Sequence, residues 1–181
     1  SLGNSVDQPT IVTGPGTGGV SGSVWVTYAE GGTIVATGAP VTGLGLVGSF
    51  SAAVPLAGIG QFGDITVGPN GQVVVNGQSD TEIQVITDPD GLGAAPFGGV
   101  VIATAINVAR FDEIPAQPSR SIDSESGLAY DRSGGAHNGR LYLVYTEETV
   151  DESNNTDILL RSSDDNGATW SDPVRVNDDT R

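Results

Sequence analysis

The sequence contains no cysteine and no lysine, and all seven of its basic residues are arginines. The absence of cysteine excludes disulfides and thiol chemistry, and it leaves the redox compartment undecided. A formal net charge of −15 argues against nucleic-acid partners and anionic membranes, because phosphate groups are bound by clustered basic side chains. No apolar run is long enough to span a bilayer. We therefore expect an acidic protein with a well-solvated surface.

Aromatic residues are also scarce, at 6%, whereas the chain holds 27 glycines and 10 prolines. No window has apolar residues at a sustained helical spacing. Many short strands joined by tight turns fit this composition better than helices do. With 181 residues, the chain is long enough for one domain with a buried core. The sequence predicts an all-β fold.

A pattern of short strands recurs three times along the chain. Its comparable starts, Thr10, Asp64 and Gly127, are roughly 50 to 60 residues apart, which is near the long end of the periods of β-propeller blades. The pattern predicts a partial β-propeller of about three four-stranded antiparallel blades, formed by residues 1–58, 59–112 and 113–181. The strands expected in these blades are residues 7–15, 23–29, 33–37, 50–56, 63–69, 72–76, 82–87, 100–108, 127–131, 140–146, 157–162 and 172–177.

The segment from Ser163 to Trp170 has the strongest local signal in the chain. It contains Asp165-Asn166-Gly167 between two strand-like runs, and this order favours a hairpin turn because Asn and Gly tolerate positive φ. The Asp side chain can accept hydrogen bonds from nearby backbone amides, and Trp170 brings a large apolar surface to bury at the start of the returning strand. We therefore predict a closed turn whose main role is structural.

The order Ser-x-Asp-x-Gly-x-Thr-Trp resembles the Asp box, or BNR repeat, of sialidases and related β-propeller proteins. In that family the turn joins the third and fourth strands of a blade. The resemblance implies that Asp165 ties the turn together and that Trp170 packs into the blade, with Ser163, Gly167 and Thr169 supporting them. It implies a sialidase-like propeller and says little about activity.

Two further segments resemble the first hairpins of blades in bacterial sialidase-like repeat proteins. They are residues 63–75, and residues 127–131 together with 139–145. The first blade has no Asp-box spacing over residues 43–51, and the second has the loop Asp88 to Gly93 where the box would stand.

Three blades do not complete a ring, because propellers close with four to eight blades. We therefore expect the chain to be a fragment of a larger ring, or to need further blades from the same or another chain. The family resemblance implies an extracellular or cell-surface location. Residues 1–5 lack the charged and apolar regions of a signal peptide, so the signal would not be part of this sequence.

The linkers that lead into the inner strands are the places where chemistry is expected, because inner strands line the channel of a propeller. Asp64 enters the second blade, and Arg120, Asp123, Glu125 and Tyr130 lie around the start of the third. Sialidases bind the substrate carboxylate with arginines, pair a Tyr nucleophile with a Glu, and use an Asp as acid and base. The resemblance makes Arg120, Asp123, Glu125 and Tyr130 candidates for such a set, and a solvated linker with an exposed ion pair is the alternative.

One further sialidase signature is altered in this chain. Sialidases have an Arg before an Ile-Pro pair, whereas here Glu113 precedes Ile114-Pro115.

The loop that begins Asp88-Pro89-Asp90-Gly91 has alternate carboxylates followed by glycine. Hard carboxylate oxygens are the ligands that Ca²⁺ prefers, so Asp88 and Asp90 are candidate calcium ligands. A turn closed by the Asp side chains on their own backbone is the alternative.

Taken together, these features predict a secreted or surface sialidase-like module that binds carbohydrate or protein, or serves a structural role, without catalysis. The alternative is a part of an exo-acting glycoside hydrolase of the sialidase type, whose catalytic set is incomplete in this chain. The fold does not decide between the two, because function belongs to sites.

Overall fold

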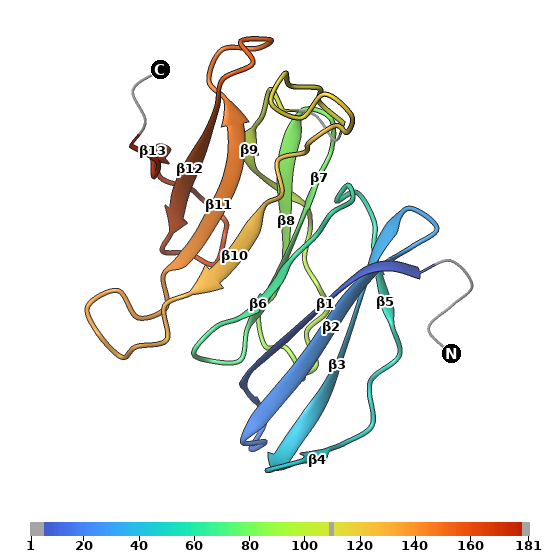
Figure 1. Cartoon of the computed structure of the whole chain (residues 1–181). Coiled ribbons are helices and arrows are strands. Elements are labelled where there is room, and N and C mark those ends of the chain that lie inside the picture. The colour runs from blue at the N-terminus through green and yellow to red at the C-terminus, as the bar shows by residue number, and fades with distance from the viewer. Residues whose placement is uncertain (1–5, 109–110, 179–181) are drawn as a thin grey trace.

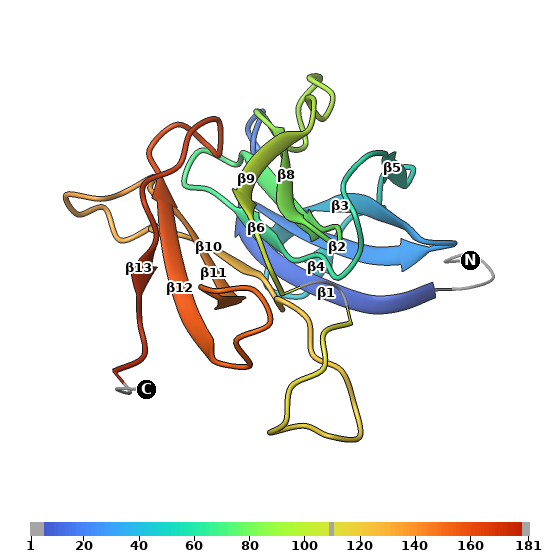
Figure 2. The same cartoon turned by 90° about the horizontal axis from the view of Figure 1, so that it is seen from above.

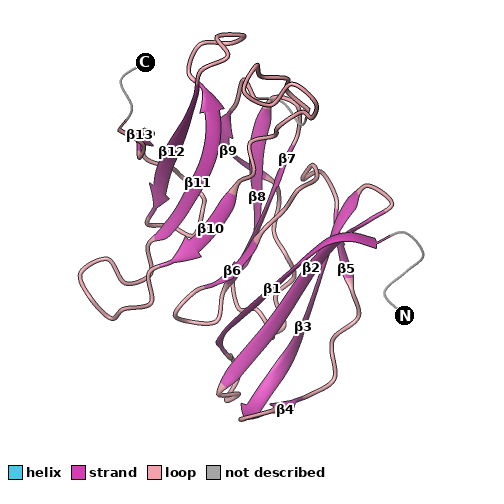
Figure 3. Ribbon diagram, viewed as in Figure 1, coloured by secondary structure: helices cyan, strands magenta, loops and turns pink. Residues whose placement is uncertain are grey.

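The structure is a computed structural model that describes residues 6–108 and 111–178, so parts of the predicted blades, residues 1–5, 109–110 and 179–181, lie outside the described ranges. Within the described ranges the regular structure is β-strand, and the predicted all-β class is confirmed (Figure 3). The same ranges contain no helix that is long and apolar enough to cross a membrane. The strands form three antiparallel sheets that follow one another along the chain and lie side by side (Figure 1).

The first sheet has the strand order β1-β2-β3-β4, and β5 pairs with β3 as well. Its strands are β1 (Val6–Pro15), β2 (Gly22–Glu30), β3 (Thr33–Gly43), β4 (Leu46–Val47) and β5 (Val54–Leu56). β3 runs past Thr37, where the sequence predicts its end before a glycine. That glycine, Gly38, pairs with Trp25, and a Cβ on it would lie 2.7 Å from the indole ring. The glycine is a close-approach position under the ring and does not end the strand.

The second and third sheets each contain four strands in sequence order. The second contains β6 (Ile65–Val67), β7 (Val73–Gln78), β8 (Glu82–Asp88) and β9 (Val101–Ala105). The third contains β10 (Gly127–Tyr130), β11 (Leu141–Glu148), β12 (Thr156–Ser163) and β13 (Val174–Arg175). Each of these eight strands coincides, at least in part, with a strand that the sequence predicts.

The second sheet lies between the other two, and apolar side chains pack on both of its faces. On β7, Val73 and Val75 join the cluster that contains Trp25 of the first sheet. The residue between them, Val74, joins the cluster that contains Leu143 of the third sheet. Every residue of β7 is buried as a result, as strand alternation between two covered faces requires.

The first strands of the three sheets meet along one line. β1 contacts β6, and β6 contacts β10 across the sheet boundaries. The starts of β6 and β10 are joined by polar groups: the Asp64 carboxylate accepts a hydrogen bond from the backbone amide of Leu128 (2.8 Å), and the buried Asn76 amide donates to the Ser126 hydroxyl (2.8 Å). The part of the β9–β10 connection that follows residue 110 projects beyond the sheets near this end (Figure 2). The three strand starts therefore face a common region.

Candidate functional site

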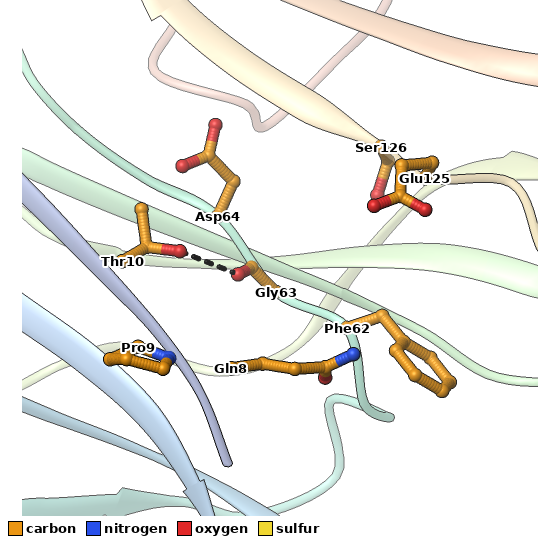
Figure 4. A pocket seen from close by; sticks show the side chains of 8 residues that line it. All are labelled: Gln8, Pro9, Thr10, Phe62, Gly63, Asp64, Glu125 and Ser126. Carbon is orange, nitrogen blue, oxygen red and sulfur yellow. Dashed lines mark hydrogen bonds between the residues drawn. The ribbon is translucent and has the colours of Figure 1, made fainter.

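A hollow of about 310 Å³ opens where the first strands of the three sheets begin. Three segments line it: residues 8–10 from β1, residues 62–64 before β6, and residues 125–126 before β10 (Figure 4). We call it the strand-start hollow. The Thr10 hydroxyl donates to the carbonyl of Gly63 across it at 3.5 Å, which links the first two segments. Each sheet thus contributes one wall.

Each segment contains one non-glycine residue with a left-handed backbone. Gln8, Phe62 and Glu125 have φ values of 50°, 55° and 44°, and each stands two residues before one of the comparable starts Thr10, Asp64 and Gly127. A bulky side chain such as Phe is a true outlier at positive φ. Strain of this kind costs about 1–3 kcal/mol per residue and persists where the surroundings impose it, often at binding sites. The repeated position marks this hollow as the leading candidate site.

Asp64 serves both the hollow and the framework. Its carboxylate accepts from the backbone amides of Ile65 (2.8 Å) and Leu128 (2.8 Å), and its own amide donates to the side-chain oxygen of Asn76. It therefore lies at the strand start that the sequence predicts, lines the hollow, and joins the second sheet to the third.

Arg120, Asp123 and Glu125 also come together, in a second hollow of about 440 Å³ beside the third sheet. Glu125 lines both hollows, and its backbone amide donates to the Asp123 carboxylate at 2.7 Å. The neighbouring Asp123 charge, with partial burial, raises the pKa of the Glu125 carboxyl, and Arg120 opposes this shift. A carboxyl with a raised pKa is suited to proton transfer.

Tyr130 does not join this group. It ends β10, whereas Glu125 precedes that strand, and its ring lies in the core between the second and third sheets. Its hydroxyl donates to the side-chain oxygen of Asn166 at 2.9 Å, and burial raises its pKa. The structure therefore holds the predicted Tyr in the protein interior, at the far end of the strand from the predicted Glu.

The 163–170 turn, where the sequence resembles an Asp box, is closed by its own side chains. The Asp165 carboxylate accepts from the backbone amide of Thr169 (2.8 Å) and from its hydroxyl (2.6 Å), and these bonds lower the Asp165 pKa. The Ser163 hydroxyl accepts from the amide of Gly167 at 2.8 Å, and the Trp170 indole donates to the Gly167 carbonyl at 3.1 Å. Gly167 has φ +88°, which the turn requires.

The same turn is bonded to the second sheet through Asn166. Its side-chain oxygen accepts from the Gln72 amide at 3.0 Å as well as from Tyr130, and its carbonyl accepts from the Thr87 hydroxyl at 2.8 Å. Trp170 packs against the apolar cluster between these two sheets. The turn therefore links two sheets at the end of the molecule opposite the strand-start hollow.

The Asp88 loop repeats this turn chemistry in the second sheet. Asp88 pairs with the first residue of β7 as Ser163 pairs with the first residue of β11, so the two residues occupy equivalent positions. The Asp88 carboxylate accepts from the amide of Gly91 at 2.7 Å, and the Asp90 carboxylate accepts from the amides of Ala94 (3.0 Å) and Ala95 (3.2 Å). Burial raises the Asp88 pKa, against the opposing effect of the hydrogen bonds from the backbone amides of Asp90 and Gly91.

This loop has the geometry of the self-closed turn that the sequence leaves open as the alternative to calcium binding. Both carboxylates are directed to backbone amides of their own loop. In the described ranges, no three acidic or histidine side chains are grouped so that they could hold a metal ion. The Asp88 and Asp90 carboxylates therefore accept hydrogen bonds that close their own loop.

Two residues of the strand-start hollow, Gln8 and Phe62, are not among the sequence-predicted site residues. Neither residue type has a preference for a left-handed backbone, so their own chemistry gives no local signal. A signal exists only in the repeat, because both stand two residues before a comparable strand start, as Glu125 does.

Comparisons of the chain with protein-family models, with curated proteins and with solved structures found no significant match. The functional argument below therefore rests on the residues and their geometry.

Proposed function

We propose that the chain is a secreted or cell-surface, sialidase-like β-propeller module that binds a glycan or a protein at the strand-start hollow, without catalysis. Its three sheets are three blades with β1, β6 and β10 as inner strands, and further blades from the same or another chain complete the ring. The self-closed turn at Asp165, and the equivalent turn at Asp90, support this relationship. The location outside the cell follows from the resemblance to sialidases alone.

The observation that carries the binding function is the convergence of three strained residues on one hollow. Gln8, Phe62 and Glu125 come from three different sheets, share a left-handed backbone, and line the same space. They supply an amide, an aromatic ring and a carboxylate. Hydrogen-bonding groups beside one aromatic surface are what a small polar ligand needs for orientation and contact area.

Chemical-shift changes during titration with neutral and sialylated oligosaccharides and with peptides test this proposal. We expect a bound ligand to perturb the amides of residues 8–10, 62–64 and 125–126 together. The Phe62→Ala variant should weaken binding by about tenfold, since an aromatic contact contributes roughly 1.5 kcal/mol. Phe50, an exposed ring between β4 and β5, provides the matched control Phe50→Ala, which should bind normally. Perturbations confined to other surfaces would refute this site.

A second candidate function is a part in exo-glycosidic hydrolysis, which the hollow shared by Arg120, Asp123 and Glu125 favours. Two adjacent carboxyls with different surroundings are the minimum for acid and nucleophile or base roles, and the raised pKa of Glu125 suits the acid. Tyr130 takes no part in this candidate, because its hydroxyl is bonded in the core.

Release of a fluorescent leaving group from a sialoside and from neutral glycosides tests the hydrolase. If Glu125 is the acid, Glu125→Gln should reduce kcat by at least about 100-fold and remove the alkaline limb of the pH profile. Turnover that Glu125→Gln leaves unchanged would rule out this role. Absence of turnover in an assembly that contains all blades would rule out the hydrolase and leave the binding function in place.

A further inference from the structure

We propose that the strand-start hollow binds a protonated amine, so that its ligand carries an ammonium group and no carboxylate. This inference rests on the proposed binding function, since it specifies the ligand chemistry of the same site. The ammonium group also distinguishes this site from a site that binds the carboxylate of an acidic sugar.

The charge of the lining residues is the first step. The acidic residues Asp64 and Glu125 line the hollow, and none of its lining residues that the structure describes is basic. Arg120 lies on the other side of Glu125, in the second hollow, and does not line this one. A space walled by like negative charge attracts cations and repels a carboxylate ligand.

The aromatic residues are the second step. Phe62 lines both the strand-start hollow and a neighbouring one of about 490 Å³. In the neighbouring hollow the ring of Phe111 meets that of Phe62 edge to face, with centroids 5.9 Å apart, and Asp7 supplies another carboxylate. Phe111 is largely exposed. Aromatic faces next to carboxylates bind ammonium groups by cation–π attraction together with charge.

The hairpins around the hollow extend its negative field. β2–β3, β7–β8 and β11–β12 all turn at the end where β1, β6 and β10 begin, as their antiparallel registers require. These hairpins add the acidic residues Glu30, Glu82, Asp151 and Glu152 to the same end of the molecule. Clustered charge of one sign raises the local concentration of oppositely charged ligands, in a salt-dependent way.

A buried hydroxyl without a partner supplies an independent observation. Thr27 is 1% exposed, and its side-chain oxygen has no hydrogen-bond partner in the described structure. It lines a narrow recess together with Gln8, Phe62 and Gly63, three residues that also line the strand-start hollow. An unpaired buried hydroxyl is destabilising by roughly 1–3 kcal/mol. The recess has no room for a water-sized group, so an ammonium N–H would reach and satisfy this hydroxyl only with a shift of the Gln8 or Phe62 side chain.

An organic cation fits these residues better than a metal ion does. Among the described residues, no three acidic or histidine side chains are grouped so that they could hold a metal ion, and Phe62 adds an apolar residue to the lining of the hollow. Divalent ions such as Ca²⁺ require six or more oxygen ligands. An amine needs only a few acceptors and one aromatic face.

Isothermal titration with paired probes tests the amine directly. Oligomers of glucosamine and of N-acetylglucosamine share one backbone and differ in charge, and Nα-acetyl-lysine amide carries the same ammonium on a peptide. At about pH 6 and low salt, we expect at least one ammonium probe to bind, about tenfold or more tightly than the acetylated oligomer, and more weakly as salt rises. Binding of only the lysine probe would identify a protein ligand, and of only glucosamine a glycan.

Three variants locate the binding. Glu125→Gln, at an exposed position, should weaken ammonium binding about tenfold while thermal unfolding is unchanged. Thr27→Val should weaken binding yet leave the protein equally or more stable, because it removes an unpaired hydroxyl. Asp164→Asn is the matched control, since Asp164 is an acid paired with Arg140 far from this end, and it should bind normally.

Equal affinity for the acetylated and the ammonium oligomers would overturn the amine inference, as would an equal loss of binding in Asp164→Asn and Glu125→Gln. If sialyllactose or a neutral sugar bound in a Phe62-dependent way, the amine would be refuted while the binding function stood. If no probe shifted the amides of the hollow, both proposals would fail.

Discussion

Replacing Asn166 should weaken the contact between the second and third sheets and so destabilise the protein. Its side-chain oxygen accepts hydrogen bonds from Gln72 (3.0 Å) and from the buried Tyr130 hydroxyl (2.9 Å), and its φ is 57°. Asn166→Gly keeps the left-handed backbone but leaves two donors unpaired, which should destabilise the protein by about 2–4 kcal/mol. Asn166→Ala should be worse by about another 1 kcal/mol, because alanine resists a left-handed backbone.

Urea unfolding followed by circular dichroism measures this loss, with the midpoint falling while the slope m stays constant. Thermal unfolding gives a second reading. At about 2.1 cal/mol/K per residue, the 181-residue chain has an unfolding entropy near 0.4 kcal/mol/K, so a loss of 2 kcal/mol lowers Tm by about 5 °C. Asn166→Asp, which keeps an oxygen acceptor and tolerates positive φ, is the matched control and should lose much less.

A double-mutant cycle with Tyr130→Phe separates the hydrogen bond from the backbone effect. Tyr130→Phe should destabilise the native protein by about 1 kcal/mol, but beside Asn166→Gly it should be neutral or stabilising, since it removes a donor that has already lost its partner. The reasoning would be refuted if Tyr130→Phe cost the same in both backgrounds, or if Asn166→Gly stayed within about 0.5 kcal/mol of the native protein.

Three more predictions concern stability. Burial raises the pKa of Glu147 above its usual 4.5, against the backbone bond from Asn107, so the folded state favours the protonated acid. This preference stabilises the folded state below about pH 4.5, and the stabilisation is lost as the pH rises through the raised pKa of Glu147. The urea midpoint should therefore fall over this pH window, and it should fall less in Glu147→Gln. Gly38→Ala should cost about 1–3 kcal/mol because its Cβ meets the Trp25 ring at 2.7 Å, whereas Gly99→Ala, with no atom within 4 Å, should be nearly neutral in thermal unfolding. Gly167→Val should lower Tm by several degrees because φ is +88° there, and an unchanged Tm would count against the turn.

The features that sequence alone predicts are those controlled by neighbours in the chain. The 163–170 turn forms as predicted because Asp165, Asn166 and Gly167 supply its acceptor and its positive φ locally. The β-strands of the second and third sheets follow from β-rich runs bounded by Gly and Asn. Where a distant contact decides, prediction fails: Gly38 continues β3 because a ring from β2 lies over it.

The candidate site shows the same division. Asp64 and Glu125 could be identified because they are charged residues at predicted strand starts. Gln8 and Phe62 could not, since only tertiary packing holds them in a left-handed backbone. Tyr130 is close to Glu125 in sequence, but Tyr130 ends the four-residue strand β10 and Glu125 precedes that strand, so nearness in sequence does not imply a shared site.

The burial of β7 on both faces has a consequence for folding. Val74 and Val75 contact different neighbouring sheets, so the second sheet gains its apolar contacts only after both neighbours have docked. A sheet in this position has no water-facing side on which to persist alone. We therefore expect the three sheets to unfold as one cooperative unit, and the backbone amides of β7 to exchange with deuterium only through global opening of the chain.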